Sequence, residues 1–335
     1  MDVIKATSAA DFLGLVPALV GCTPSCSIVA IPFAGSRTIG AARFDLNPTL
    51  DPATLASAIV GVICRVPAAD GFAVVVYTDE AGEASQGLVS ALLACADKCG
   101  LVVADALYVA RDGWGSYMAD DKPRPLSEIN TALAEDRPAA ADQHAGTEIP
   151  AADPDRLDAV TTAFEDFGLG DVAEADWIAL GEVAVTTPAE EIDPLDAVCL
   201  IFALSRPALR DIALVQWATN QAGGERAAEA QAEWERGQEY PTDLAAIMWG
   251  DAPRPDATRL TAALATVRHL VALTPQPLRA GLLATAAWLS WALGRSTHAA
   301  DFTHQALTAE PGHGLAEIVN SFARASHLPS WAFEN

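Results

Sequence analysis

The feature that most constrains this chain is an unbroken apolar run at residues 72–76, with the sequence Phe-Ala-Val-Val-Val. The run leads into Tyr77-Thr78-Asp79-Glu80, where it becomes polar. Apolar side chains without polar alternation are typical of a strand that is buried on both faces. Such a strand lies in the middle of a sheet that helices cover, so the run predicts an α/β fold organised around residues 72–78.

The segments around this strand predict a small mixed sheet flanked by helices. Helices are predicted over 9–20, 52–64 and 83–99, and further strands over 27–33, 37–46 and 101–110. The first two strands are joined by a short turn at Gly35 and are predicted as a hairpin. Because helices separate the later strands, those strands are predicted to run parallel with right-handed crossovers.

The chain after residue 155 is predicted to be entirely helical. Helices are expected over 156–167, 171–185, 193–204, 207–221, 224–238, 242–249, 256–273, 277–293, 297–309 and 315–325. Between the two parts lies a stretch rich in Pro, Ala, Asp and Glu, with a short helix expected over 127–134. The predicted organisation is an α/β sheet domain at 1–120, a linker at 121–155 and a helical domain at 156–335.

The last three predicted helices carry the strongest local pattern. Gly294, Ala299, Ala306-Leu307 and Pro311 have the spacing of a tetratricopeptide unit, with helices 277–293 and 297–309 as its two arms. Stable arrays of this repeat need about three units. One tetratricopeptide-like unit therefore predicts a packed helical hairpin first, and a peptide-binding groove second.

The charge of the chain excludes several classes of partner. The formal net charge is -24 and the isoelectric point is about 4.4. A field of this sign repels nucleic-acid phosphates and anionic lipids, so we expect no nucleic-acid and no membrane partner. The most apolar stretch, 280–294, is interrupted by Thr285 and Ser290 and is shorter than the ~20 residues of a membrane span. The acidic residues Asp2 and Asp11 argue against a secretory signal, which favours a cytoplasmic protein.

The six cysteines are too few for a disulfide framework in a chain of 335 residues. They are Cys22, Cys26, Cys64, Cys95, Cys99 and Cys199. The pairs Cys22/Cys26 and Cys95/Cys99 could build a four-thiolate zinc site if they met in space. The glycines of zinc knuckles are missing, so we interpret the cysteines as reduced core residues and expect no metal.

Acidic residues follow the predicted strands. Asp45 ends the second strand, Asp79 follows the central one and Asp112 follows the last. Ligands of open α/β sheets lie beyond the carboxyl ends of strands, so these candidate catalytic carboxylates could hold Mg²⁺. The alternative is that they are turn and cap residues, with Arg43 pairing with Asp45 on the same strand face. For Asp79 we favour a helix cap.

Trp114, Ser116 and Tyr117 form a polar and aromatic turn at a strand end. They are candidate binding residues, although a packed corner explains them as well. The chain has no Gly-x-Ser-x-Gly nucleophile elbow, no phosphate-binding lysine loop and no dinucleotide-binding glycine pattern. We therefore expect no cofactor.

Several short segments occur in a characteristic order along both parts of the chain. They are 12–21 with Pro24 and 27–29, then 43–46, 74–79, 105–109, 112–114 with Ser116-Tyr117, Arg210-Asp211 and 277–331. In this order the chain resembles an uncharacterised actinobacterial family known only as a domain of unknown function. Its members often carry a Cys beyond the Ser-Tyr, where this chain has Met118-Ala119-Asp120, and residues 223–250 do not match. The resemblance implies an α/β N-terminal half and a helical C-terminal half, but no activity.

These observations favour a non-catalytic cytoplasmic protein that binds a protein partner or associates with itself. The missing catalytic motifs and the repeat-like helical half support this hypothesis. One alternative is a metal-assisted hydrolase or transferase that uses the acidic strand ends. The other is a small-molecule sensor with a pocket near Trp114.

Overall fold

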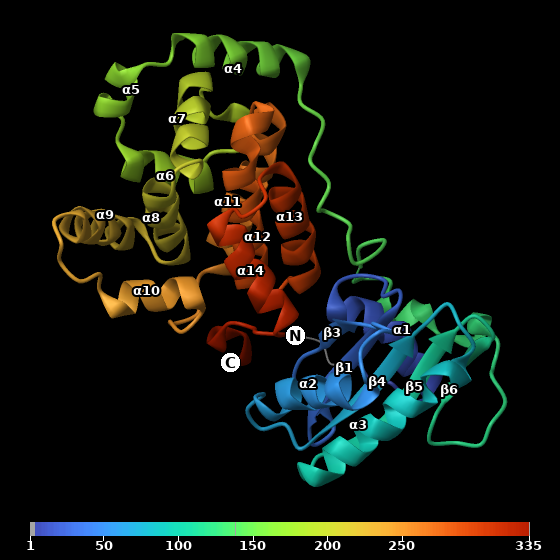
Figure 1. The fold of residues 1–335 in the computed structure, drawn as a ribbon. Helices are drawn as coiled ribbons and strands as arrows, with labels where there is room; N and C mark the ends of the chain where they lie inside the picture. Colours follow the sequence, from blue (N-terminus) through green and yellow to red (C-terminus); the bar gives the residue numbers. More distant parts are fainter. Residues whose placement is uncertain (1–3, 138, 335) are drawn as a thin grey trace. The chain divides into compact units, whose positions relative to one another are not determined.

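The computed structural model describes residues 4–137 and 139–334. The chain forms two compact units, with the division between Ala145 and Gly146. The first unit contains the sheet and the second is helical (Figure 1). The predicted fold class, a mixed sheet with helices followed by a helical half, is confirmed.

The sheet of the first unit has six strands in the described residues. They are β1 (Ser27–Ala34), β2 (Arg37–Thr38), β3 (Ala42–Asp45), β4 (Gly71–Tyr77), β5 (Val102–Ala110) and β6 (Gly113–Ser116). The order is β2-β1-β4-β5-β6, and β3 also pairs with β1. β1 is antiparallel to β4, and β4 is parallel to β5. The central strand is buried along its whole length, as the apolar run predicts.

The predicted strand at 37–46 is wrong, because the structure divides it into β2 and β3. Both pair antiparallel with β1, at its C-terminal and N-terminal ends respectively. The interruption lies opposite Pro32, which has no backbone N–H to donate to a ladder. At this point the Ile39 N–H still donates to the Pro32 carbonyl, at 3.0 Å.

The strand β6 contains Trp114 and Ser116, which were predicted to lie in a turn at a strand end. It pairs with β5 through Leu107–Ser116 to Ala110–Gly113. Glycine is needed at two of its positions because neighbours come close. A Cβ on Gly115 would lie 2.5 Å from the Tyr108 hydroxyl, and one on Gly113 would overlap the Arg124 carbonyl. Two glycines in four residues resemble a turn in the sequence, which hid this strand.

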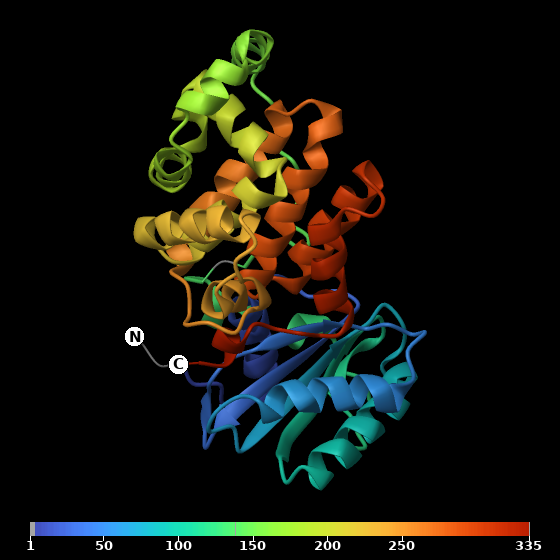
Figure 2. The same ribbon diagram turned by 60° about the vertical axis from the view of Figure 1, so that its left-hand side comes forward.

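Helices cover both faces of the sheet (Figure 2). α1 (Ala9–Val20) packs on one face with Val29, Val75 and Trp114. α2 (Pro52–Cys64) and α3 (Gln86–Lys98) pack on the other, which is the larger apolar core of the unit. The predicted helix at 83–99 begins with a 3₁₀ turn, Gly82–Ser85, before α3.

Residues 121–145 contact the sheet unit at several places. Arg124 exchanges two backbone hydrogen bonds with Trp114, and Ala140 exchanges them with Gly21 and Thr23. The helix predicted at 127–134 is wrong, since the structure has two 3₁₀ turns, Leu126–Glu128 and Thr131–Ala134. Asn130 separates the turns, and its side chain accepts a hydrogen bond from the Ala132 N–H.

The second unit contains eleven α-helices in the described residues. They are α4 (Pro154–Asp166), α5 (Leu169–Glu174), α6 (Trp177–Thr186), α7 (Pro194–Leu204), α8 (Pro207–Ala218), α9 (Gln221–Glu235), α10 (Thr242–Trp249), α11 (Ala257–Leu273), α12 (Arg279–Ala292), α13 (Ser296–Ala309) and α14 (Gly314–Arg324). The helix predicted at 171–185 is two helices, because Asp176 caps a new helix at Trp177. In the described part of the chain, no helix is both long enough and apolar enough to cross a membrane.

The centre of the helical unit is α12, whose residues Ala280–Ala292 are all buried. α11, α13 and α14 pack around it (Figure 1). α13 contacts it through small and aromatic residues that are fully buried: Ala299, Phe302 and Ala306. The hairpin predicted for helices 277–293 and 297–309 is present, and the next predicted helix, 315–325, packs against both of them as α14.

We expect Ala306→Leu to destabilise the helical unit by roughly 1–3 kcal/mol, because the larger side chain overpacks the contact between α12 and α13. Ala306 is fully buried, whereas His304 on the same helix is exposed. His304→Ala is therefore the matched control and should change stability much less. Urea unfolding followed by circular dichroism measures both, and equal stability of the two variants would contradict this packing.

Candidate functional site

The acidic residues predicted at the strand ends lie at one edge of the sheet. β3 and β4 are both antiparallel to β1, and β5 is parallel to β4, so their C-terminal ends meet where β1 begins. Asp45 ends β3, while Asp79 and Asp112 follow β4 and β5 by two residues. The structure thus brings these three strand ends to one edge.

Each of these carboxylates has a protein partner. Arg43 donates to Asp45 at 2.9 Å, as the spacing on β3 predicted, and the Cys26 thiol donates to Asp79 at 3.4 Å. Asp112 accepts the Gly82 N–H at 3.1 Å, where the 3₁₀ turn begins. The helix cap expected for Asp79 is therefore wrong. Asp112 instead accepts the backbone N–H at the start of the 3₁₀ turn.

The cysteines do not assemble the four-thiolate site that was considered. Cys22 and Cys26 lie at the edge where β1 begins, whereas Cys95 and Cys99 precede the first residue of β5. The length of β4 separates these edges by roughly 20 Å. Within residues 4–137 and 139–334, no three His, Cys, Asp or Glu side chains are arranged to hold a metal ion.

The three residues predicted as a binding turn are all engaged within the first unit. Trp114 is 3 % exposed in the core beneath α1, with Arg124 stacked on its ring. The Ser116 hydroxyl donates to Asp105 at 2.6 Å. The Tyr117 hydroxyl donates to the Gly82 carbonyl at 2.8 Å, and burial raises the pKa of Tyr117 to about 12. These contacts describe a packed corner.

A pocket of about 470 Å³ lies in the helical unit. The start of α8, the end of α10 and the loop between α13 and α14 bring its residues together. Its lining combines charged side chains with large apolar ones: Ser205, Pro207, Arg210, Asp211, Met248, Trp249, Glu310, His313, Gly314, Leu315 and Ile318. The volume lies in the range of small-molecule and side-chain binding sites, ~300–1,000 Å³.

Two pocket residues form an unusual charge pair. Arg210 is 6 % exposed, and its Nε and Nη2 both contact Oδ1 of Asp211, at 2.9 and 2.8 Å. Among the described residues, the second oxygen of Asp211 accepts no hydrogen bond. Burial raises the pKa of Asp211, while Arg210 opposes the shift. The pair neutralises Arg210 and leaves one carboxylate oxygen to interact with a ligand.

The net charge of the pocket depends on Glu310 and on the protonation state of His313. No described residue forms an ion pair with Glu310, which follows α13. Burial and the neighbouring Arg210 lower the pKa of His313, so this side chain is neutral at pH 7. Because Arg210 and Asp211 cancel, the pocket carries about one negative charge from Glu310.

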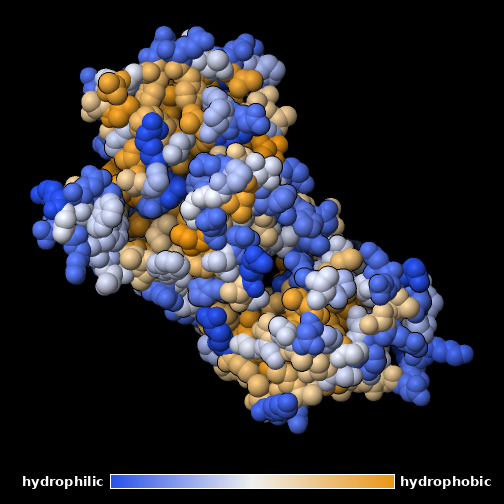
Figure 3. Space-filling view, viewed as in Figure 1, coloured by the Kyte–Doolittle hydropathy of each residue, from blue (hydrophilic) through white to orange (hydrophobic). Residues whose placement is uncertain are grey.

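The apolar rim of the pocket is exposed although its side chains are large. Trp249 is 50 % exposed and Ile318 is 39 % exposed. On the face of the molecule that Figure 3 shows, apolar surface lies interspersed among hydrophilic side chains. An aromatic ring beside carboxylates is the arrangement that binds cationic groups through cation–π and ionic contacts together.

The C-terminal segment holds the rim in place. Ser330 donates to the Gly250 carbonyl through both its N–H and its hydroxyl, and Trp288 donates to the Met248 carbonyl at 3.1 Å. Trp291 stacks on His327 and Phe322, and Trp249 packs edge-on against Phe322. The position of Trp249 therefore depends on the aromatic cluster around α12.

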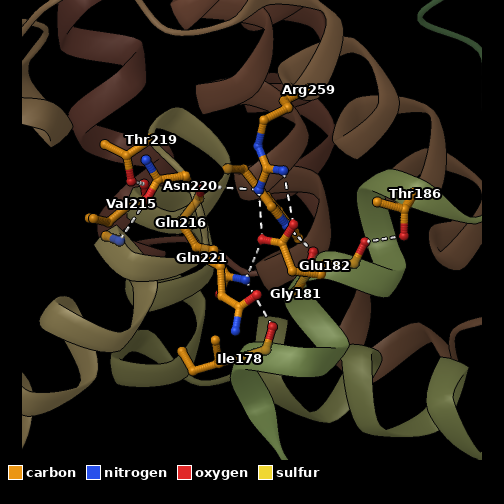
Figure 4. A network of polar contacts seen from close by, with 12 residues as sticks. Ile178, Gly181, Glu182, Thr186, Val215, Gln216, Thr219, Asn220, Gln221 and Arg259 are labelled. Carbon is orange, nitrogen blue, oxygen red and sulfur yellow. Dashed lines mark hydrogen bonds and ion pairs between the residues drawn. The ribbon is translucent and has the colours of Figure 1, made fainter.

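A second polar cluster joins α6, α8 and α11 (Figure 4). Arg259 donates to both carboxylate oxygens of Glu182, at 2.8 and 2.9 Å. Gln216, which is fully buried, donates to Glu182 and to the Ile178 carbonyl. Its amide oxygen lies against Gly181 and Gly224, where a Cβ would come within 2.6 Å. These contacts link three helices, which indicates a structural role.

We expect Arg259→Met to destabilise the helical unit by roughly 1–3 kcal/mol, since Glu182 and Gln216 would lose a charged partner. The Arg259 hydrogen bond lowers the pKa of Glu182 below 4.5 in the folded protein. Its contribution is therefore present above pH 4.5 and is lost as pH falls through the lowered pKa. Urea unfolding of both proteins at pH 7 and at lower pH should show the difference shrinking in acid. A difference that grows in acid would contradict this assignment.

No sequence pattern predicted the pocket. Arg210 and Asp211 were noted only as part of the family resemblance, and Trp249 only as part of a predicted helix. One signal is present in the sequence: Gly250 follows Trp249 directly, and glycine commonly ends a helix. In the structure Gly250 has φ 83° and ends α10 at a turn.

Comparisons with known proteins support the family resemblance and add no activity. No curated protein and no solved structure matches the chain. One family model matches, and it covers residues 10–125, which include all six described strands and, apart from Ala9, the helices that cover them. The resemblance to a family of unknown function is thus confirmed for this region: residues 10–125 match the family described as Domain of unknown function (DUF4192).

Proposed function

We propose that this chain is a non-catalytic binding protein, and that its helical unit binds a basic segment of a partner protein. The observation that carries the proposal is the pocket around Asp211, Glu310 and Trp249. An arginine or lysine side chain would place its charge between the two carboxylates. The guanidinium plane of arginine, or the methylene chain of lysine, would pack on the Trp249 ring. Nothing in the pocket requires a chemical step.

Charge decides between a basic partner and self-association. Residues 146–335 contain 27 Asp and Glu against 11 Arg and no Lys. Two copies of this unit would repel each other, whereas a basic segment would be attracted to it from a distance. The same field disfavours an anionic ligand for Arg210, whose charge Asp211 already neutralises.

The acidic edge of the sheet supports catalysis less well. Asp45, Asp79 and Asp112 each accept a hydrogen bond from a different part of the first unit. Proteins bind Mg²⁺ through one or two carboxylates that are turned toward the ion. The hydrogen bonds of these three residues turn them toward separate partners, so we favour the pocket.

The proposal is tested by removing the pocket charges one at a time. The probe is an acetylated, amidated seven-residue Gly/Ser peptide with a central arginine. Asp211→Asn and Glu310→Gln each remove one charge at nearly constant volume, and we expect each to weaken binding about tenfold. Glu229→Gln on the exposed face of α9 removes the same charge elsewhere and should leave binding unchanged. Equal binding by all four proteins would exclude the pocket as the site.

A further inference from the structure

The structure corrects the interpretation of the cysteines as core residues. Among the six, only Cys199 is buried, while Cys26, Cys64 and Cys99 are exposed. A cysteine at the surface is available to reagents, so its chemistry has to be considered. Three of the six come together in the first unit: Cys64, Cys95 and Cys99.

Adjacent helices bring these three residues together. Cys64 is the last residue of α2, and Cys99 follows the last residue of α3. Both helices pack side by side on the same face of the sheet (Figure 2). After α2 the chain continues into β4, and after α3 it continues into β5. The first residues of these strands, Gly71 and Val102, pair with each other. The parallel pairing of β4 and β5 therefore fixes the two helix ends next to each other.

The electrostatics of Cys64 reflect these neighbours. Burial raises the pKa of the Cys64 thiol, and the neighbouring side chain of Cys99 and then that of Cys95 raise it further. Cys95 is half-buried against the apolar core between the helices and the sheet. Cys95 and Cys99 are one helical turn apart, and the ~5–6 Å between such Cβ atoms is too long for a disulfide.

We propose that Cys64 and Cys99 form a reversible intramolecular disulfide, which makes the ends of α2 and α3 a redox-modified site. The oxidant is a low-molecular-weight disulfide, written RSSR. The Cys99 thiolate attacks one sulfur of RSSR, forming a mixed disulfide and releasing RS⁻, which takes up a proton. The Cys64 thiolate then attacks the Cys99 sulfur and releases the second RSH. Two thiols are oxidised and one RSSR is reduced to two RSH.

The order of the two steps follows from the environment of the thiols. Burial and the neighbouring Cys99 side chain raise the pKa of Cys64, which keeps its proton longer. We therefore assign Cys99 as the attacking residue and Cys64 as the resolving one. Cys64 is also the last residue of α2, where the helix dipole disfavours a thiolate. The exchange is consequently slow at neutral pH and accelerates as pH rises.

The proposal is tested on the full-length protein in buffers of oxidised and reduced glutathione. After oxidation we expect four of the six thiols to react with iodoacetamide under denaturing conditions, and a monomer two hydrogen masses lighter. Tryptic mapping should place the bridge between Cys64 and Cys99, and dithiothreitol should reverse it. The bridge should also raise the melting temperature by several degrees, because it closes a loop in the unfolded chain.

Single substitutions distinguish the proposed pair from other chemistry. Cys64→Ser should stop at the glutathione adduct on Cys99, whereas Cys95→Ser should still form the bridge at the wild-type rate. A bridge that includes Cys95, a disulfide between two chains, or six reactive thiols after oxidation would each overturn the proposal. A Cys64→Ser protein that takes up no glutathione at Cys99 would overturn the proposed order of attack.

Discussion

Trp291→Ala should destabilise the helical unit by about 3–5 kcal/mol, the largest effect that we expect in that unit. Trp291 is 1 % exposed on α12, and its ring contacts Phe322, His327 and Trp331. Its indole N–H also donates to the His327 carbonyl at 2.8 Å. The alanine would leave a cavity and an unpaired carbonyl in the most aromatic part of the core.

Trp291→Phe separates these contributions, because it keeps an aromatic ring and removes the N–H. We expect it to lose less than half as much stability as the alanine variant. Since the same cluster holds Trp249 at the pocket rim, both variants should also weaken binding of the arginine peptide. Thermal and urea unfolding measure the stability, and a loss below about 1 kcal/mol for Trp291→Ala would contradict this packing.

Gly14→Ala should destabilise the sheet unit by about 3 kcal/mol, at the upper end of overpacking effects. Gly14 lies on α1, and a Cβ there would overlap the backbone carbonyl of Asn130. Backbone atoms cannot move aside as a flexible side chain can. The helix would have to leave the segment at 130–134, together with the hydrogen bond from Asn130 to Asp11.

Gly61→Ala is the matched control, because Gly61 is also inside a helix of the same unit. A Cβ at this position meets no atom within 4 Å. Alanine has the higher helix propensity, so this change should stabilise the unit by up to about 1 kcal/mol. Urea unfolding of both variants gives the comparison. If Gly14→Ala were as stable as Gly61→Ala, α1 would not pack on residue 130 as described.

Local patterns predicted the elements of this chain well, for physical reasons. The apolar run at 72–76 identified β4 because a strand buried on both faces has no polar alternation. Helix ends were predictable where a cap residue precedes a proline, as at Asp51-Pro52. The acidic residues could be placed at strand ends from the sequence, and the pairing of β3 and β4 with β1 brings those ends to one edge.

Contacts between distant segments were not predictable in the same way. The pocket combines residues near 210, 249 and 313, and helical periodicity shows which face of each helix is apolar but not which helices meet. Cys64 and Cys99 belong to different helices, whereas the spacing within the chain drew attention to Cys95 and Cys99. The strand β6 was hidden because close approach of Tyr108 requires glycines that resemble a turn.

Calorimetric titration of the wild-type protein with two peptides tests the proposed binding function most directly. The first is the acetylated peptide with a central arginine, and the second carries citrulline, which has nearly the same shape without the charge. We expect the arginine peptide to bind at least about tenfold more tightly at pH 7, a difference of ~1.4 kcal/mol. Its affinity should fall as pH decreases below 6.5, because protonation of His313, whose pKa burial lowers, and of Asp211, whose pKa burial raises, removes the negative charge of the pocket. Equal affinity for both peptides, or no binding of either, would contradict the proposal that this pocket receives a basic side chain.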